Sequence, residues 1–227
     1  MMEGTYESEL VYYSYCSDHV PNPITWGGYE DSSNTWFYLS DFHDMDSNLN
    51  EISDVKKFVK IVAGVHEASI GKSPEGKYGF HVTTHLANVP ITNTWIDSWE
   101  DWYTRALEDM YSFEKGSYGV DEEPEVIFEA LRSKVIPRLL RPLETGGRSI
   151  KPCLLHSDLW PCNCMPEKGK DGKFIIFDSC AVWGHSEYDL GSWRASRYRM
   201  GERFFSEYEQ RMGWSEPKEN WDDRNRL

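Results

Sequence analysis

Three polar side chains suited to phosphoryl transfer follow two short apolar runs of the sequence. Asp158 and Asn163 come after the run 153–155, and Asp178 comes directly after the run 174–177. One carboxylate could accept the proton of an attacking hydroxyl, while the amide and the other carboxylate could hold hard cations against phosphate oxygens. These residue types in this order therefore predict chemistry on a magnesium-bound nucleotide.

The spacing also matches the catalytic-loop signature of kinases, H-x-D-L-x-x-x-N, which here reads His156, Asp158, Leu159 and Asn163. An alternative is that Asp158 and Asn163 are turn residues between two strands of one hairpin, because Asp and Asn favour such turns. The carboxylate of Asp178, placed at the end of the next apolar run, favours the catalytic interpretation.

The composition indicates a folded and acidic chain of 227 residues with a formal net charge of -14. This length suits one domain or a two-lobed one. No basic stripe is present to neutralise phosphates, so we expect no nucleic-acid partner. The sequence shows no signal peptide and no apolar span that could cross a bilayer, so we expect a cytoplasmic protein that does not bind membranes.

Hydrophobic periodicity and turn residues predict the elements that position these side chains. Helices are expected over residues 4–16, 53–70, 95–113, 124–144 and 187–210, strands over 24–26, 35–39, 153–155 and 174–177, and an irregular loop over 72–93. Pro137 is expected to kink the helix that contains it. In a kinase-like chain the exit from strand 35–39, with Asp41, Phe42 and His43, is the hinge where adenine pairs with backbone groups.

Two sets of side chains have a packing interpretation and a binding interpretation. His66 falls on the apolar face of its helix, which favours a packed histidine with one hydrogen bond over a metal ligand. The aromatic stripe of the helix 95–113, which includes Trp99 and Trp102, favours core packing over a platform for stacking a sugar.

Longer stretches around these residues resemble the fructosamine (ketosamine) 3-kinase family, in the form found in fungi. The stretches are LLHSDLWPCNC, FIIFDSCAVWGHSEYDL and GKYGFHVTTHL, and the resemblance covers nearly the whole chain. It implies an α+β, protein-kinase-like fold, shared with the aminoglycoside phosphotransferases and choline kinases. Residues 1–45 would form a remnant of the small lobe, with one helix, a hairpin and the hinge, and residues 46–227 the helical large lobe.

The resemblance also implies an activity: ATP-dependent phosphorylation of the 3-hydroxyl of ketosamines, such as fructosyl- or ribulosyl-lysine, which repairs glycated proteins. Asp158 would be the catalytic base, and Asn163 and Asp178 would bind Mg²⁺. Trp160 would pack on the sugar, although a buried anchor for the catalytic loop is an equal alternative. His156 would support the loop, and Asp189 would hydrogen-bond the loop's backbone.

The sequence departs from the family pattern in several places. The family places a glycine-rich strand pair and a lysine before the first helix, and further helices after the last one, and these are absent from the sequence. Thr5 stands where that helix has its lysine-pairing Glu, and Ser157 stands at a family glycine, a modest cost if φ stays negative. We therefore expect an impaired kinase. The alternatives are an incomplete gene model of an ordinary active enzyme, a non-catalytic protein that binds ketosamines or a partner, or another small-molecule kinase of the aminoglycoside or choline kinase type.

Overall fold

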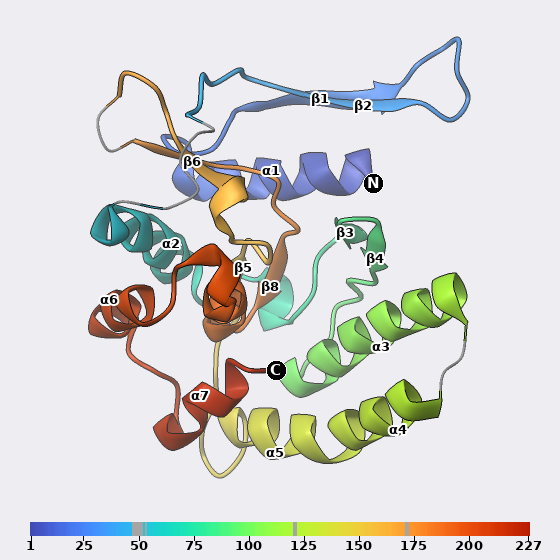
Figure 1. Ribbon diagram of the computed structural model, residues 1–227, viewed down its shortest axis with the longest axis vertical. Coiled ribbons are helices and arrows are strands. Elements are labelled where there is room, and N and C mark those ends of the chain that lie inside the picture. Colours follow the sequence, from blue (N-terminus) through green and yellow to red (C-terminus); the bar gives the residue numbers. More distant parts are fainter. Residues whose placement is uncertain (47–51, 53, 120–121, 171–172) are drawn as a thin grey trace.

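The computed structural model describes residues 1–46, 52, 54–119, 122–170 and 173–227. A helix and a long hairpin lie above a larger, mainly helical part (Figure 1). The helices are α1 (Met2–Cys16), α2 (Val55–Ser69), α3 (Trp99–Tyr118), α4 (Glu122–Ala130), α5 (Ile136–Leu140), α6 (Glu202–Met212) and α7 (Trp221–Arg224). The strands are β1 (Pro23–Gly28), β2 (Trp36–Ser40), β3 (Thr84–Leu86), β4 (Val89–Ile91), β5 (Cys153–Leu155), β6 (Cys164–Pro166), β7 (Phe174–Ile176) and β8 (Val182–Gly184). This mixed helix and strand architecture confirms the predicted fold class.

The strands pair in antiparallel twos: β1 with β2, β3 with β4, β5 with β8, and β6 with β7. The predicted hairpin of β1 and β2 is confirmed. The two strands that precede the candidate catalytic residues, β5 and β7, each pair with a different strand, so Cys153 faces Gly184 and Cys164 faces Ile176. The alternative in which Asp158 and Asn163 form the turn between two strands of one hairpin is therefore wrong.

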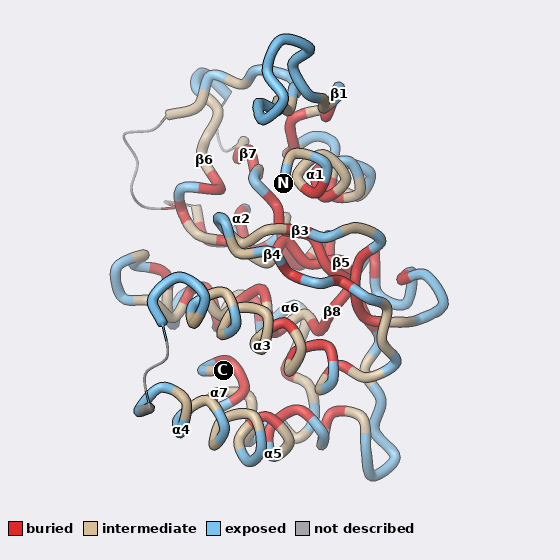
Figure 2. Tube along the Cα trace, turned by 90° about the vertical axis from the view of Figure 1, so that its right-hand side faces the viewer, coloured by how far each residue is buried: buried red, intermediate tan, exposed pale blue. Residues whose placement is uncertain are grey.

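Helix α2 is the centre of the larger core. Its apolar side chains at Phe58, Val59 and Val62 are fully buried, and the carboxylate of Asp54 accepts a hydrogen bond from the Lys57 amide at its first turn. Such a cap satisfies one of the free N–H groups at a helix start. The helix packs against α6 and β5, and buried residues are concentrated at this level of the molecule (Figure 2). Helix α2 thus supports β5, the strand that leads into Asp158.

Several predicted elements differ from the structure. Of the predicted helix 187–210 only the second part is α-helical, as α6, because Ser186–Arg194 forms a 3₁₀-helix and the positive φ of Arg199 and Gly201 breaks the chain before α6. The predicted loop 72–93 contains the β3–β4 hairpin, whose turn residue Ala87 has φ of 53°. Alanine is not a residue that signals such a turn, so the sequence pattern did not reveal it.

The predicted helix 124–144 begins as α4 and is interrupted by a π-helical turn, Leu131–Val135, directly before α5. Pro137 cannot donate a backbone hydrogen bond to the preceding turn, which accounts for an interruption at this point. None of the helices in the described ranges is long and apolar enough to cross a membrane.

Candidate active site

The loop between β5 and β6 carries the first two candidate catalytic residues. The amide nitrogen of Asn163 donates hydrogen bonds to the backbone oxygen of Asp158 at 3.0 Å and to its carboxylate Oδ2 at 2.8 Å. Asn163 is buried, and these bonds leave its Oδ1 as the side-chain atom able to ligate a cation.

The pKa of the half-buried Asp158 is raised, first by burial and next, among the raising effects, by the negative charge of Asp178. Hydrogen bonds from Asn163 and from the Trp160 side chain act in the opposite direction. A carboxylate whose basicity is raised in this way accepts a proton more readily from a hydroxyl. The third candidate residue, Asp178, is therefore close enough to act electrostatically on the first.

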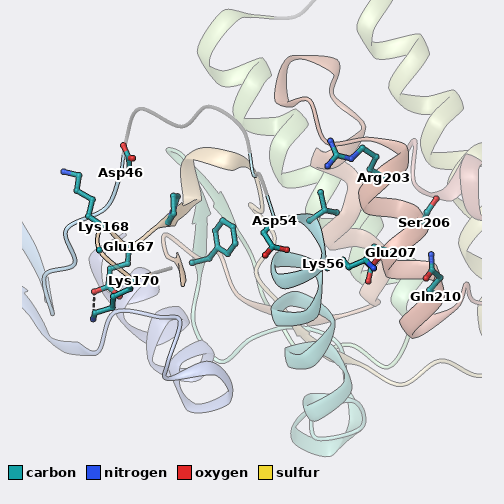
Figure 3. Close-up of a pocket in the computed structure, with 14 residues that line it drawn as sticks. Asp46, Asp54, Lys56, Glu167, Lys168, Lys170, Arg203, Ser206, Glu207 and Gln210 are labelled. Atoms are coloured by element: carbon teal, nitrogen blue, oxygen red, sulfur yellow. Dashed lines mark hydrogen bonds and ion pairs between the residues drawn. The ribbon is translucent and has the colours of Figure 1, made fainter. Parts of the chain in front are cut away.

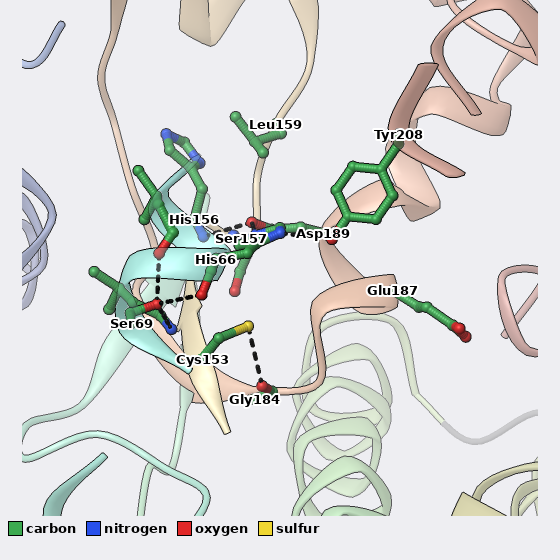
Figure 4. Close-up of polar contacts among 12 residues, drawn as sticks. His66, Ser69, Cys153, His156, Ser157, Leu159, Gly184, Glu187, Asp189 and Tyr208 are labelled. Carbon is green, nitrogen blue, oxygen red and sulfur yellow. Dashed lines mark hydrogen bonds and ion pairs between the residues drawn. The ribbon is translucent and has the colours of Figure 1, made fainter. Parts of the chain in front are cut away.

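Asp189 lies beside the catalytic-loop residues His156 and Ser157 and supports their backbone (Figure 4). Its Oδ1 accepts a hydrogen bond from the Ser157 amide at 2.6 Å, and its Oδ2 accepts one from the His156 amide at 2.9 Å. The same Oδ2 accepts a bond from Nε2 of His66 at 3.0 Å, while Nδ1 of His66 accepts one from the Tyr208 hydroxyl at 2.8 Å. His66 is thus a packed histidine, as predicted, but with two hydrogen bonds instead of one.

His156 joins the loop to the strand segment that carries Asp178. Its Nε2 donates to the Phe177 backbone oxygen at 3.1 Å, and its Nδ1 accepts from the Asp158 amide at 3.3 Å. Burial lowers the pKa of His156, so the ring is kept neutral and can make both bonds. The Cys180 amide also donates to the His156 backbone oxygen at 2.9 Å. These bonds hold the 156–163 and 177–180 segments side by side.

Two residues at the ends of these strands adopt left-handed backbone conformations. Ser157 has φ of 67° and Asp178 has φ of 62°. The condition of negative φ at Ser157 is therefore not met, and its Cβ carries a larger conformational cost than we expected. Non-glycine residues in this region concentrate at functional sites, where surrounding contacts hold them.

Helix α1 contributes contacts that the sequence analysis missed. The carboxylate Oε1 of Glu9 accepts hydrogen bonds from the Ser179 amide at 2.6 Å and from its hydroxyl at 2.8 Å, and the Ser8 hydroxyl accepts one from the Ala181 amide at 3.1 Å. Burial raises the pKa of Glu9 to about 7. Because the partners lie about 170 residues apart in the sequence, no local pattern could have revealed them.

A cleft of about 330 Å³ lies between the predicted hinge and Asp178. Asp41, Phe42 and His43 line one side, and Glu9 and Asp178 are also part of its wall. Its volume is in the usual range for small-molecule sites. The Asp41 amide donates to the Asn22 backbone oxygen at 3.0 Å, so this donor is already used. Adenine would have to be read by other backbone groups of the hinge.

Trp160 lies beside the catalytic loop and is partly buried. Its ring centroid is 5.3 Å from that of Tyr198, in a tilted arrangement, so one part of the indole is packed and another remains accessible. In α3, Trp99 and Trp102 are buried and stacked at 5.1 Å, which confirms the core interpretation for them. Farther along the same helix, Leu107 and Met110 line a second cavity of about 400 Å³.

That second cavity reaches the catalytic loop. Its lining combines apolar residues of α3 with Ser157, Tyr188 and Asp189. A molecule bound there would therefore touch residues adjacent to Asp158. The sequence analysis did not predict it, because it forms only where α3, the loop and the chain end meet.

A third hollow of about 1050 Å³ lies near the start of α2, between β6 and α6 (Figure 3). Lysine, arginine and carboxylate side chains line it together, among them Lys56, Lys168, Arg203, Glu167 and Glu207. Charges of both signs give it no clear ligand preference. Its described lining comes from elements other than the catalytic loop.

Hard oxygen atoms at the candidate site suit a magnesium ion. Within the described parts of the chain, no group of three or more His, Cys, Asp and Glu side chains is arranged as a metal site. A cation site here would combine the Asp178 carboxylate with the Asn163 amide oxygen. Mg²⁺ accepts such a set because it binds through one or two carboxylates and completes its shell with water and substrate phosphates.

A sequence profile described as fructosamine kinase matches residues 9–227. The chain belongs to the fructosamine kinase family. Relatives include the chloroplastic protein-ribulosamine 3-kinase of Arabidopsis thaliana, 27% identical over 209 residues that cover 91% of this chain and 56% of that protein. The ketosamine-3-kinase of Mus musculus is 38% identical over 116 residues, which are 50% of this chain and 34% of that protein.

The chain spans about half the length of the curated plant relatives that it matches. Solved structures support its fold. A Haemophilus somnus protein described as a fructosamine-3-kinase superposes with a TM-score of 0.74 at 18% identity, covering 99% of this chain and 68% of that one. An aminoglycoside phosphotransferase, APH(4)-Ia, superposes with a TM-score of 0.59 at 19% identity, covering 98% and 72%.

Proposed function

We propose that this chain carries the catalytic loop of a ketosamine 3-kinase. The reaction is ATP-dependent, Mg²⁺-dependent phosphorylation of the 3-hydroxyl of fructosyl- or ribulosyl-lysine, on glycated proteins or as small ketosamines, and it serves deglycation. Family membership and the printed names of the plant and mouse relatives support this class of substrate. The observation that carries the proposal is the hydrogen bond between Asn163 and the Asp158 carboxylate, on which the Asp178 charge also acts.

In this proposal Asp158 is the base. Its carboxylate accepts the proton of the 3-hydroxyl, and the sugar oxygen then forms a bond to the γ-phosphorus of ATP. The bond from that phosphorus to the β–γ bridging oxygen breaks, and ADP leaves with the electron pair. Asn163 Oδ1 and the Asp178 carboxylate would hold Mg²⁺, which would supply positive charge beside the phosphate oxygens.

The proposal extends to the other predicted site residues. Asp41, Phe42 and His43 border the cleft that would receive adenine. The accessible part of Trp160 would pack against the sugar ring near Asp158. The lobe boundary near residue 45 and the cytoplasmic location stay predictions.

A non-catalytic binding function is the second candidate. The described lining of the nucleotide cleft contains the carboxylates of Glu9, Asp41 and Asp178 and no lysine or arginine. Such a wall offers little attraction to an anionic nucleotide without added cations. A protein that binds ketosamines without using ATP would be compatible with this cleft.

Single-turnover assays with labelled ATP and either fructosyl-lysine or ribulosyl-lysine test the proposal. We expect phosphate transfer by the wild-type chain, and a loss of roughly 10²–10⁴-fold in Asp158→Asn, since that is the usual contribution of a positioned acid or base. Asp97→Asn is the matched control, because its side chain is 88% exposed and lies on a loop before α3. Equal transfer by Asp158→Asn and wild type would reject the assignment of the base.

Calorimetry separates the two candidates. Ketosamine binding without any binding of ATP in the presence of Mg²⁺ would support the non-catalytic function. Transfer to an aminoglycoside or choline in place of ketosamines would support the related small-molecule kinases instead.

A further inference from the structure

Helix α1 is attached directly to the segment that carries Asp178. Glu9 is 2% exposed, and its Oε1 accepts both hydrogen bonds of Ser179, the residue that follows Asp178. One residue earlier on the helix, the buried Ser8 hydroxyl accepts a bond from the Ala181 amide. Two neighbouring side chains of α1 thus fix the backbone at residues 179 and 181.

The backbone at residue 178 needs such support. Asp178 has φ of 62°, a conformation that residues with a Cβ rarely adopt on their own. The direction of its carboxylate depends on this angle and on the orientation of the peptide that joins it to Ser179. Because the Ser179 amide points at Glu9 Oε1 from 2.6 Å, the same hydrogen bond fixes that peptide.

Burying a carboxylate at position 9 of α1 costs free energy. A buried, ionisable side chain loses its hydration, whereas an apolar residue on the inner face of α1 would not. The need for hydrogen-bond acceptors at this position would explain why a carboxylate is buried here. These acceptors satisfy two donors of Ser179 at the wall of the nucleotide cleft, which Glu9 and Asp178 share.

We infer that Glu9 is a positioning residue for the metal ligand Asp178. It does not touch the cation; it holds the 178–179 peptide so that the Asp178 carboxylate stays beside Asn163 and Asp158. This inference rests on the proposed function, in which Asp178 binds Mg²⁺. Residues that orient metal ligands typically contribute 10–100-fold to metal affinity.

The test is binding of Mn²⁺, as a paramagnetic substitute for Mg²⁺, to the full chain in the presence of a non-hydrolysable ATP analogue. Glu9→Leu removes both acceptor bonds at similar volume, and we expect it to weaken Mn²⁺ binding by roughly tenfold or more. Glu9→Gln keeps an acceptor oxygen for both donors and should stay within about threefold of wild type. A purely structural role would lower the melting temperature of Glu9→Leu and leave the Mn²⁺ affinity of the folded protein unchanged.

Two further variants keep the test decisive. Glu7→Leu is the matched control, because Glu7 lies on the same helix but contacts His81, and it should bind Mn²⁺ like wild type. Ser179→Ala removes only the hydroxyl bond, so it should weaken Mn²⁺ binding by a smaller factor and serves if Glu9→Leu does not fold.

The outcomes separate the inference from the proposed function. Nucleotide-dependent Mn²⁺ binding with equal affinity in wild type, Glu9→Leu and Ser179→Ala would overturn the positioning role alone. Absence of nucleotide-dependent Mn²⁺ binding in the wild type would overturn both the proposed function and the inference.

Discussion

Two buried carboxylates support the two loops of the candidate site, and they do so in different ways. Asp189 accepts hydrogen bonds from two backbone amides of the catalytic loop and from His66, which is in turn bonded to Tyr208. Glu9 accepts two bonds from Ser179, and within the described parts of the chain no lysine or arginine side chain pairs with it. Each carboxylate stands next to a residue with left-handed backbone, Ser157 or Asp178.

The difference concerns how the charge of each carboxylate is compensated. Three N–H donors converge on Asp189, two from the catalytic loop and one from α2, so its contacts form a network whose parts depend on one another. At Glu9 the donors offset only part of the cost of burial, and its pKa is raised to about 7. We therefore expect the support that Glu9 gives to the Asp178 segment to have a free-energy cost that depends on pH.

The largest expected effect comes from removing the carboxylate of Asp189. Asp189→Ala leaves the amides of His156 and Ser157 and the His66 ring without their acceptor, and it should lower the free energy of unfolding by about 3–5 kcal/mol. Chemical denaturation measures this change. Asp223→Ala is the control, because Asp223 forms an exposed ion pair with Arg138 and its loss should cost less than about 1 kcal/mol. Similar losses in the two variants would contradict the network.

The second prediction concerns pH and Glu9. Its pKa is about 7 in the folded protein and has the ordinary value of 4.5 in an unfolded chain, so the folded state binds more protons between these values. The free energy of unfolding should therefore fall as the pH rises from 4.5 to 7, by about 3 kcal/mol from this group. Glu9→Gln cannot ionise and should lack this fall.

Urea denaturation at pH 5 and pH 8 checks this prediction. The stability of Glu9→Gln relative to wild type should be greater at pH 8 than at pH 5. A difference between the two proteins that is the same at both pH values would show that Glu9 is not shifted upward in the folded state.

The same comparison explains what could be predicted from the sequence. The α1, α2 and α3 helices and the β1–β2 hairpin follow from periodicity and turn residues, and the kinase-like fold is implied by the family resemblance of the longer stretches around Asp158. The pairing of β5 with β8 and of β7 with β6 did not, because three-residue strands carry no register information. Nor did the 3₁₀ conformation around Asp189, where contacts with the loop determine the backbone.

Of the two carboxylates that support the loops, only Asp189 could be predicted from the sequence. Asp189 lies in a stretch whose resemblance to known kinases indicates its bonds to the loop backbone, and the structure places it there. Glu9 lies on a helix with mixed polar and apolar positions, and its partner Ser179 lies in a distant segment. A single buried acid gives no periodic signal, so only the folded chain reveals this contact.

The smallest expected effect separates backbone strain from side-chain contacts at Ser157. Its φ of 67° disfavours a Cβ, and its hydroxyl is buried with no hydrogen-bond partner among the described residues. Ser157→Ala removes only the hydroxyl, whereas Ser157→Gly removes the Cβ as well. The relief of left-handed strain should stabilise Ser157→Gly by about 1 kcal/mol, and the greater conformational entropy of its unfolded chain reduces this gain. We expect Ser157→Gly to be more stable than Ser157→Ala in urea denaturation.

Arg199→Gly is the matched control for that step, because Arg199 has φ of 54° and is exposed outside the site. If the bonds to Asp189 only offset the left-handed strain at Ser157, relieving that strain should stabilise both positions to a similar extent. The gain of Ser157→Gly over Ser157→Ala should then be close to the gain of Arg199→Gly over wild type. A Ser157→Gly variant that is less stable than Ser157→Ala would mean that the Cβ itself packs usefully against the loop. The catalytic loop would then be held by side-chain contacts at Ser157 as well as by the bonds to Asp189, which would widen its difference from the Asp178 segment.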